Sequence, residues 1–331
     1  MDEARYDVVG IGNAIVDIIG RCDDAFLSKH DLQKGFMRLI DERAADALYG
    51  AMGPGIERSG GSAANTIAGV ASFGGRAAFI GRVAEDQFGT IFAHDIRSIG
   101  VAYDTPPATS GAPTARCLIF VTPDGERTMN TFLGASTELG SGEVNADLIA
   151  SARVTYLEGY LFDKPEAKQA FTTAAALAAK AGRKTALTLS DAFCVDRHRT
   201  DFLKLVRDGI DILFANEKEI TALFEANSFE EAVKAVRGAC EIAVLTRSEQ
   251  GSVIVTPKAT IDIRPDRVAE VVDVTGAGDL YAAGFLYGLT RSLSLADCGR
   301  LGSLAAAEVI SHIGARPERP LKELARTAGL A

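Results

Sequence analysis

The sequence predicts an α/β protein: a three-layer αβα core around a mainly parallel β-sheet, and a small second β-sheet that forms a lid. Near-continuous apolar strand segments alternate with helical segments along most of the chain, which is typical of a parallel sheet covered on both faces. Two strand-rich segments, residues 13–40 and 105–135, interrupt this alternation. We therefore assign residues 1–12, 41–104 and 136–331 to the core and the two interrupting segments to the lid.

The first third of the chain is expected to open the core and to supply one part of the lid. Glycines stand where helices should stop, and Pro54 with its neighbouring glycines predicts a loop over residues 50–61. The expected elements are strands at 6–12, 14–19, 36–40 and 77–80, a short helix after residue 23, and helices from 41, over 62–73 and over 86–99.

The rest of the chain begins with a hairpin and then returns to alternating strands and helices. An Asp-Gly turn at 124–125 separates two short strand patterns. The expected strands are 115–122, 127–132, 154–157, 185–189, 210–214 and 242–245, a late antiparallel pair at 251–256 and 259–263, and a strand at 268–272. A buried helix is expected over 280–289, another helix over 295–313 and a short one after Pro320.

Composition excludes several classes of protein. The formal charge of −9 argues against a protein that binds a nucleic-acid backbone. No apolar run approaches the roughly 18 residues that span a bilayer. The five cysteines are scattered without a C-x-x-C pair, and the charged N-terminus does not resemble a signal peptide, so we expect a cytoplasmic protein with reduced cysteines. The four histidines show no metal-ligand spacing.

Two common nucleotide-binding motifs are missing. Gly10 and Gly12 match the start of the dinucleotide fingerprint, but Ile15 stands at its last glycine position, and a strand pattern follows where a helix is required. The chain also lacks the glycine-lysine motif of P-loop enzymes and the signatures of protein kinases. These observations argue against a nicotinamide dehydrogenase and against both of those kinase classes.

The strongest candidate for a site is Asp-Val-Thr-Gly-Ala-Gly-Asp at residues 273–279. It lies between the expected strand 268–272 and the buried helix 280–289. Unpaired amides at the start of a helix, assisted by the helix dipole, form an anion site such as a phosphate would occupy. Asp279 in such a turn should stay ionised and accept a proton from a hydroxyl beside the phosphate. The alternative is an ordinary acidic residue in a first helical turn.

Two further groups of polar residues are candidates for binding hydroxyls. Gly61 permits close approach of a ligand to the backbone, and Asn65 in the following helical turn offers a donor and an acceptor to a pair of hydroxyls, although Ser62 reads equally as a helix cap. Asn13 and Asp17 have the even spacing that places them on one side of a strand, where a vicinal diol would satisfy both; local turn capping is the alternative.

Asn216 and Glu219 follow a strand and open a helix. The carboxyl end of a parallel strand is where ligands bind in α/β proteins, but the pair also has the spacing of a capping box. Arg127 on the hairpin is either a solvated charge or, if the hairpin covers the site, a contact to a phosphoryl group.

Together these residues resemble the ribokinase-like (PfkB) family of small-molecule kinases over nearly the whole chain. Two signatures carry the resemblance, residues 60–65 continuing to 81–89, and residues 273–279. Val274 stands where the family commonly has threonine, and Ser248 replaces a frequent glycine, which affects the loop on the nucleotide side.

The resemblance implies ATP and Mg²⁺ as cofactors. Asp279 would be the base, and the amides of Gly276, Ala277 and Gly278 would form an anion hole for the γ-phosphate. Asn216 and Glu219 match the family's N-x-x-E motif, which helps to place the metal, largely through water. The remaining residues expected along the nucleotide are Thr246, Gly251, Thr275, Gly278 and Ser303.

Within the family the chain looks most like the adenosine kinases. In that branch the residues equivalent to Asn13, Asp17, Gly61 and Asn65 hold ribose hydroxyls, and an aromatic residue near Phe162 stacks on the base, with Tyr160 as a rival position. We expect phosphoryl transfer to the primary hydroxyl of adenosine or a related nucleoside, by a monomer or a homodimer formed through the lid. The alternatives are a kinase of free ribose, fructose or a similar sugar, and a nucleoside-binding regulator without turnover.

Overall fold

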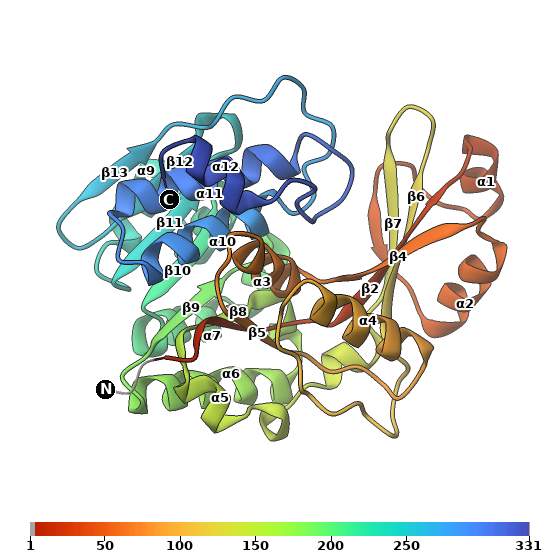
Figure 1. The fold of residues 1–331 in the computed structure, drawn as a ribbon, viewed down its shortest axis with the longest axis horizontal. Coiled ribbons are helices and arrows are strands. Elements are labelled where there is room, and N and C mark those ends of the chain that lie inside the picture. The colour runs from red at the N-terminus through yellow and green to blue at the C-terminus, as the bar shows by residue number, and fades with distance from the viewer. Residues whose placement is uncertain (1–3, 331) are drawn as a thin grey trace.

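An eight-stranded β-sheet forms the centre of the larger part of the protein (Figure 1). A computed structural model describes residues 4–330; residues 1–3 and 331, assigned to the core from the sequence, lie outside the described residues. The strands from β5 to β11 are parallel, and β12 and β13 are added antiparallel, as predicted. Their order is β13 (Thr260–Ile263), β12 (Ser252–Val255), β11 (Ile242–Thr246), β10 (Ile212–Asn216), β9 (Lys184–Thr188), β8 (Ala152–Glu158), β1 (Tyr6–Ile11), β5 (Ala77–Ile80).

Helices cover both faces of this sheet and confirm the predicted three layers. Successive strand residues point to opposite faces, so Val8 packs in one hydrophobic cluster and Val9 in the other. One face carries α3 (Ser62–Ser72), α4 (Gln87–Ser98), α10 (Ala277–Thr290), α11 (Leu295–Val309) and α12 (Leu321–Thr327). The other carries α5 (Ala146–Ala150), α6 (Pro165–Lys180), α7 (Ala192–Gly209), α8 (Glu217–Phe224) and α9 (Phe229–Val236). Short 3₁₀ turns are η1 (Gly134–Glu138), η2 (Ser141–Glu143), η3 (Gly159–Asp163) and η4 (Ser248–Gln250).

A five-stranded sheet, here called the small sheet, stands at one end of the core (Figure 1). Its strands, in order, are β3 (Met37–Leu39), β7 (Arg127–Phe132), β6 (Ala115–Val121), β2 (Ile15–Arg21) and β4 (Gly55–Gly60). Leu27 of α1 (Asp24–Lys29) and Leu48 of α2 (Glu42–Ala51) pack with Leu118 and Phe120 on one face. Cys117, Ile119 and Val121 lie on the other face.

Two local predictions were wrong. Residues 50–61, expected to be a loop of the core, contain β4, which pairs antiparallel with β2 and so extends the small sheet. The proline and glycines predict a loop locally, but the open edge of β2 offers a ladder of hydrogen bonds. Residues 268–272, expected to be a strand, pair with no strand: Val271 and Val272 are 55% and 44% exposed, and the Val272 N–H donates to the Ile310 carbonyl at 2.8 Å.

No helix among residues 4–330 is long and apolar enough to cross a membrane.

Candidate active site

The glycine turn before α10 has the geometry of an anion-binding helix start. Gly276 is the N-cap residue with φ of +80°, and a Cβ there would lie 2.8 Å from the Ala315 Cα. At Gly278 a Cβ would meet no atom within 4 Å, so the turn opens to free space. The Ala277 N–H, expected in the anion hole, instead donates to the Val274 carbonyl at 3.2 Å, whereas the N–H groups of Gly276 and Gly278 have no partner among the described residues.

Asp279 lies in the first turn of α10 and is held by the first turn of α3. The Ser62 hydroxyl donates to Oδ1 at 2.6 Å, and the Asn65 amide donates to Oδ2 at 3.1 Å. The two helices approach closely because Gly69 has no side chain: a Cβ there would lie 2.5 Å from the Ala283 Cβ. Asp279 is therefore a positioned carboxylate with two donors from a neighbouring helix, and not a solvated first-turn acid.

Burial sets the ionisation of Asp279. It raises the pKa of the carboxyl to about 6, against the hydrogen bonds from Ser62 and Asn65 and the positive charge of Arg316, which all lower it. The electropositive turn alone would lower the pKa of Asp279, but the opposite effect of desolvating the carboxylate is larger. At neutral pH the group is mostly ionised and still basic enough to accept a proton.

Arg316 completes this cluster, and sequence reasoning missed it. It lies in the segment between α11 and α12, and its Nε donates to Asn65 Oδ1 at 2.7 Å. Its Nη2 donates to the Ser59 carbonyl at 2.7 Å. Nothing in the local sequence marks this arginine, because its partners lie far away along the chain.

Gly61 joins β4 to α3 in a conformation that suits glycine. Its φ is +101°, and a Cβ would lie 2.1 Å from the Asn13 carbonyl oxygen. Gly61 is itself the N-cap of α3, so Ser62, interpreted as a possible cap, is free to bond Asp279 instead.

Replacing Gly61 with alanine should therefore destabilise the protein by at least about 1–3 kcal/mol, because both the positive φ and the backbone contact oppose a Cβ. Chemical denaturation measures this. Gly53→Ala is the matched control, because Gly53 has a negative φ and open space around its Cβ position. Equal stability of the two variants would contradict the described conformation.

Asn13 and Asp17 differ in what they contact. Asn13 precedes β2, so the even spacing of a strand does not relate the two residues. The Asn13 amide donates to Glu158 Oε1 at 2.6 Å, and its Oδ1 accepts from the Ser136 hydroxyl at 2.8 Å. Glu158 also accepts the Ala63 N–H at 2.7 Å, and its burial raises its pKa to about 7. Both polar atoms of the Asn13 side chain are therefore hydrogen-bonded within the protein, and these bonds fix the connection between β1 and β2.

The Asp17 carboxylate has no hydrogen-bond partner among the described residues. It fits against Gly60, where a Cβ would lie 2.3 Å from Oδ2. Burial raises its pKa to about 6, opposed by the charges of Arg316 and Arg127. Asp17 is partly buried, so its carboxylate can be reached by water or by a hydroxyl of a ligand that supplies the missing donor. The Asp17 carboxylate therefore keeps its acceptor capacity for a donor from a ligand or from water.

Arg127 brings the small sheet to the phosphate turn. Its guanidinium forms a buried ion pair with Asp273, the first residue of that turn. Asp273 also accepts the N–H of Gly314 at 2.8 Å and of Thr275 at 3.0 Å. The Arg127 Nε is buried and has no partner among the described residues. The hairpin therefore does cover the turn, as one of the two interpretations of Arg127 requires.

Asn216 and Glu219 form a complete capping box. The Glu219 N–H donates to the Asn216 side chain at 2.9 Å, and the Glu219 carboxylate accepts both the Asn216 N–H at 2.9 Å and its amide. Glu219 is buried, which raises its pKa to about 7. Among residues 4–330 no cluster of three or more histidine, cysteine or acidic side chains has a metal-binding arrangement. The geometry therefore shows this pair as a helix cap. The negative charge of Asp279 also acts on the Glu219 carboxylate.

The residues expected along the nucleotide lie at a strand end, in loops and, for Ser303, inside α11. Thr246 ends β11, and Gly251 has a φ of +83° with a Cβ position 2.1 Å from the Ile263 carbonyl oxygen. The Ser303 hydroxyl accepts the Asp266 N–H at 2.8 Å and so fixes the segment after β13. The Thr275 N–H is bound to Asp273.

The expectation that Phe162 stacks on a base was wrong. Phe162 is 3% exposed and packs in the hydrophobic cluster beneath the sheet, with its ring centroid 4.2 Å from that of Phe202. Tyr160, two residues earlier, is 40% exposed. The 3₁₀ turn η3 directs the two aromatic rings to different surroundings.

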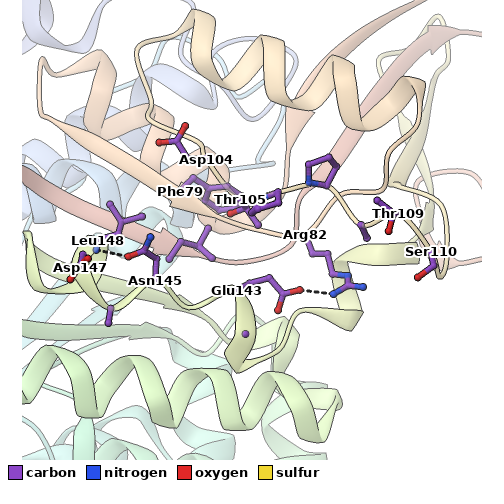
Figure 2. A pocket seen from close by; sticks show the side chains of 16 residues that line it. Phe79, Arg82, Asp104, Thr105, Thr109, Ser110, Glu143, Asn145, Asp147 and Leu148 are labelled. Atoms are coloured by element: carbon purple, nitrogen blue, oxygen red, sulfur yellow. Dashed lines mark hydrogen bonds and ion pairs between the residues drawn. The ribbon is translucent and has the colours of Figure 1, made fainter.

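A large cavity lies elsewhere, beside the edge strand β5 (Figure 2). It encloses about 660 Å³ between residues 104–110 and 142–148. Arg82, in the second half of the first signature, borders it and pairs with Glu143. None of the predicted site residues lines this cavity, so the cluster around Asp279 remains the candidate active site.

This fold and cluster define a class of protein: an α/β phosphotransferase with a carboxylate beside an anion-binding helix start. The model of the pfkB family of carbohydrate kinases matches residues 56–322. A crystal structure of a probable sugar kinase protein from Rhizobium etli CFN 42 is similar, with 54% identity, a TM-score of 0.91, and coverage of 99% of this chain and 100% of that one.

The crystal structure of adenosine kinase from Sinorhizobium meliloti is also similar, with 54% identity, a TM-score of 0.90, and coverage of 98% of this chain and 100% of that one. Probable fructokinase-6, chloroplastic, from Arabidopsis thaliana is 30% identical over 81% of this chain and 74% of its own length. The chain belongs to the PfkB family. It is a phosphotransferase with an alcohol acceptor that acts on a nucleoside or sugar, and kinases of this family use ATP.

Proposed function

We propose that this kinase transfers the γ-phosphoryl group of ATP to the primary hydroxyl of a ribosyl substrate, adenosine or a related nucleoside. The observation that carries the proposal is the pair of partly buried carboxylates, Asp279 and Asp17, where the small sheet meets the core. Asp279 is held by donors from α3, and Asp17 on β2 has none among the described residues. One carboxylate suits proton removal, and the other suits recognition of hydroxyls.

Asp279 is the base in this proposal. It takes the proton of the acceptor hydroxyl as that oxygen attacks the γ-phosphorus. The N–H groups of Gly276 and Gly278 and the dipole of α10 stabilise the charge on the phosphoryl oxygens. Arg127 approaches from the small sheet, which acts as a lid and keeps water from the phosphoryl group. Because the transition state is loose, positioning and electrostatics supply most of the acceleration.

The nucleotide lies along Thr246, Gly251, Thr275 and Ser303 in this proposal. The Glu219 carboxylate already accepts two donors from Asn216, so direct coordination of a metal by this pair fits poorly and contact through water fits better. Asn216 and Glu219 would then hold Mg²⁺ through water, and the ion, when bound, would neutralise phosphate charge.

The acceptor lies between the small sheet and α3. Asp17 accepts hydrogen bonds from the ribose hydroxyls, next to the backbone at Gly61, while Asn13 and Asn65 fix the shape of this wall through their protein contacts. Ile15 and Ile19 share a face of β2 with Asp17 by strand alternation and are partly exposed there. An aliphatic wall around Asp17 suits a planar base better than a free sugar, whose hydroxyls need polar partners.

The similarity to an adenosine kinase at 54% identity supports the nucleoside. The equal similarity to a probable sugar kinase, and the fructokinase relative, support a free sugar as the second candidate.

A coupled assay of ADP formation tests the proposal. Adenosine, other nucleosides, ribose and fructose are compared at matched concentrations with magnesium and ATP. We expect turnover with a nucleoside at least about tenfold above that with either sugar, a difference of about 1.4 kcal/mol in transition-state binding. Turnover with a sugar alone would overturn the acceptor assignment. Nucleoside binding without any turnover would indicate a regulator.

A further inference from the structure

Arg316 connects two parts of the site that are distant in sequence. Its Nε donates to Asn65 Oδ1 at 2.7 Å, and the amide nitrogen of the same side chain donates to Asp279. An asparagine amide can flip and exchange its donor and acceptor. With a guanidinium on Oδ1, a flip would set donor against donor, so Arg316 keeps the Asn65 N–H directed at Asp279.

The same guanidinium contacts the connection between the small sheet and the core. Its Nη2 donates to the carbonyl of Ser59 at 2.7 Å and lies 3.2 Å from its hydroxyl. Ser59 precedes Gly60, the last residue of β4, and Gly61, which links β4 to α3. The Ser59 N–H and hydroxyl both donate to Asp95 of α4, at 2.7 and 2.6 Å. Arg316 and Asp95 therefore hold Ser59, near the end of β4, from two sides.

The segment that carries Arg316 is itself anchored. Glu308 of α11 accepts the N–H groups of Glu318 at 3.0 Å and Arg319 at 2.9 Å. Gly314 in this segment donates to Asp273, the partner of Arg127. Residues 314–316 thus contact both the ion pair that brings the small sheet onto the core and the amide that orients Asp279.

We propose that Arg316 is a positioning residue that links the seating of the small sheet to the orientation of Asp279. This rests on the proposed role of Asp279 as the base. When β4 and its glycine link are seated, the guanidinium is fixed by Ser59 and holds Asn65 against Asp279. When the link moves, Arg316 loses the Ser59 contacts and the carboxylate loses its fixed donor. Phosphoryl transfer is thereby coupled to the position of the small sheet.

Charge gives a second readout. Arg316 is the positive group that faces Asp279, and it lowers the pKa of that carboxyl. Burial lowers the pKa of Arg316 itself to about 10, so it stays charged at neutral pH. The other charged or titratable groups that interact with Asp279 are Asp17 of β2, Tyr156 and Glu158 of β8, Tyr160 of η3 and Glu219 of α8. Without Arg316 these acids remain, and the pKa of Asp279 should rise.

The experiment compares the full chain with Arg316→Gln and Arg316→Lys. We measure kcat and KM against pH with magnesium, ATP and the best acceptor from the panel. Arg316→Gln should lower kcat about 100-fold, the scale expected for a misplaced reacting group. The acidic limb of its kcat–pH profile should move to higher pH, because Asp279 must be deprotonated to act as the base. Arg316→Lys should lose rate but keep the acidic limb near that of the unmodified protein, since the charge remains.

Arg319→Gln is the matched control, an exposed arginine on the same segment, and should leave both quantities unchanged. Amide hydrogen exchange over residues 55–61 gives a readout without turnover, and we expect faster exchange in both Arg316 variants. Unchanged kcat and acidic limb in Arg316→Gln, or unchanged exchange in both variants, would overturn the proposal. If Asp279→Asn keeps full activity, the proposed function fails, but the exchange result still tests the contact with Ser59 separately.

Discussion

Replacing Asp279 with asparagine is expected to lower turnover by about two to four orders of magnitude while the protein still folds, the range expected for the loss of a general base. Asparagine has nearly the same shape but cannot accept the proton. Its carbonyl oxygen can still accept the Ser62 hydroxyl, although its amide nitrogen would face the Asn65 amide. Removing a partly buried charge offsets part of that conflict, because desolvation opposes the ionised form of Asp279.

The measurement is kcat from ADP formation, with circular dichroism melting to confirm the fold. The matched control is Asp297→Asn. Asp297 also lies in the first turn of a helix, α11, where it bonds Ser294 on the surface. If Asp279 were an ordinary first-turn acid, the two variants would behave alike. Near-normal turnover of Asp279→Asn would remove the base from the proposed mechanism.

Replacing Arg127 with glutamine should lower both turnover and stability. We expect kcat to fall about 10²–10³-fold, the cost of losing one group that stabilises charge in the transition state. The free energy of unfolding should fall by up to about 3–5 kcal/mol, because the Asp273 charge stays buried without its counter-ion. The N–H groups of Gly314 and Thr275 still donate to Asp273. Because they partly stabilise its charge, the loss of unfolding free energy should lie toward the smaller value.

The double variant Arg127→Gln with Asp273→Asn separates the two effects. Removing both charges leaves no unpaired ion, so urea denaturation should show most of the stability restored. Turnover should stay low, because no guanidinium reaches the phosphoryl group. If turnover recovered along with stability, Arg127 would serve only to hold the small sheet on the core.

Much of the fold follows from local sequence patterns. Strand β5 coincides with its predicted range of 77–80, and the hairpin of β6 and β7 lies within a residue of its predicted ends. Apolar runs, alternation and turn residues are properties of neighbouring residues, so the sequence reveals them directly. The turn at 273–279 was identifiable for the same reason, since its glycines and Asp279 are contiguous.

Pairing between distant segments was not predictable in this way. β4 begins directly after Pro54 and contains two glycines and two charged residues, a composition that does not indicate a strand. It becomes a strand because it pairs with the open edge of β2. The segment 268–272 has the composition of a strand but meets no neighbouring strand. Phe162 and Tyr160 are both aromatic, so the sequence does not distinguish which of them is buried. The path of the backbone through η3 decides it.

By itself, then, the sequence determined the alternating core, the hairpin, the phosphate turn with Asp279 and the family to which they belong. The tertiary structure alone decided the surroundings of those residues. Asn65 and Arg316 are 251 positions apart, and Asn13 and Glu158 are 145 apart, yet each pair is hydrogen-bonded. Such contacts depend on how helices and sheets pack, and burial of the resulting cluster is what raises the pKa of Asp279 to about 6.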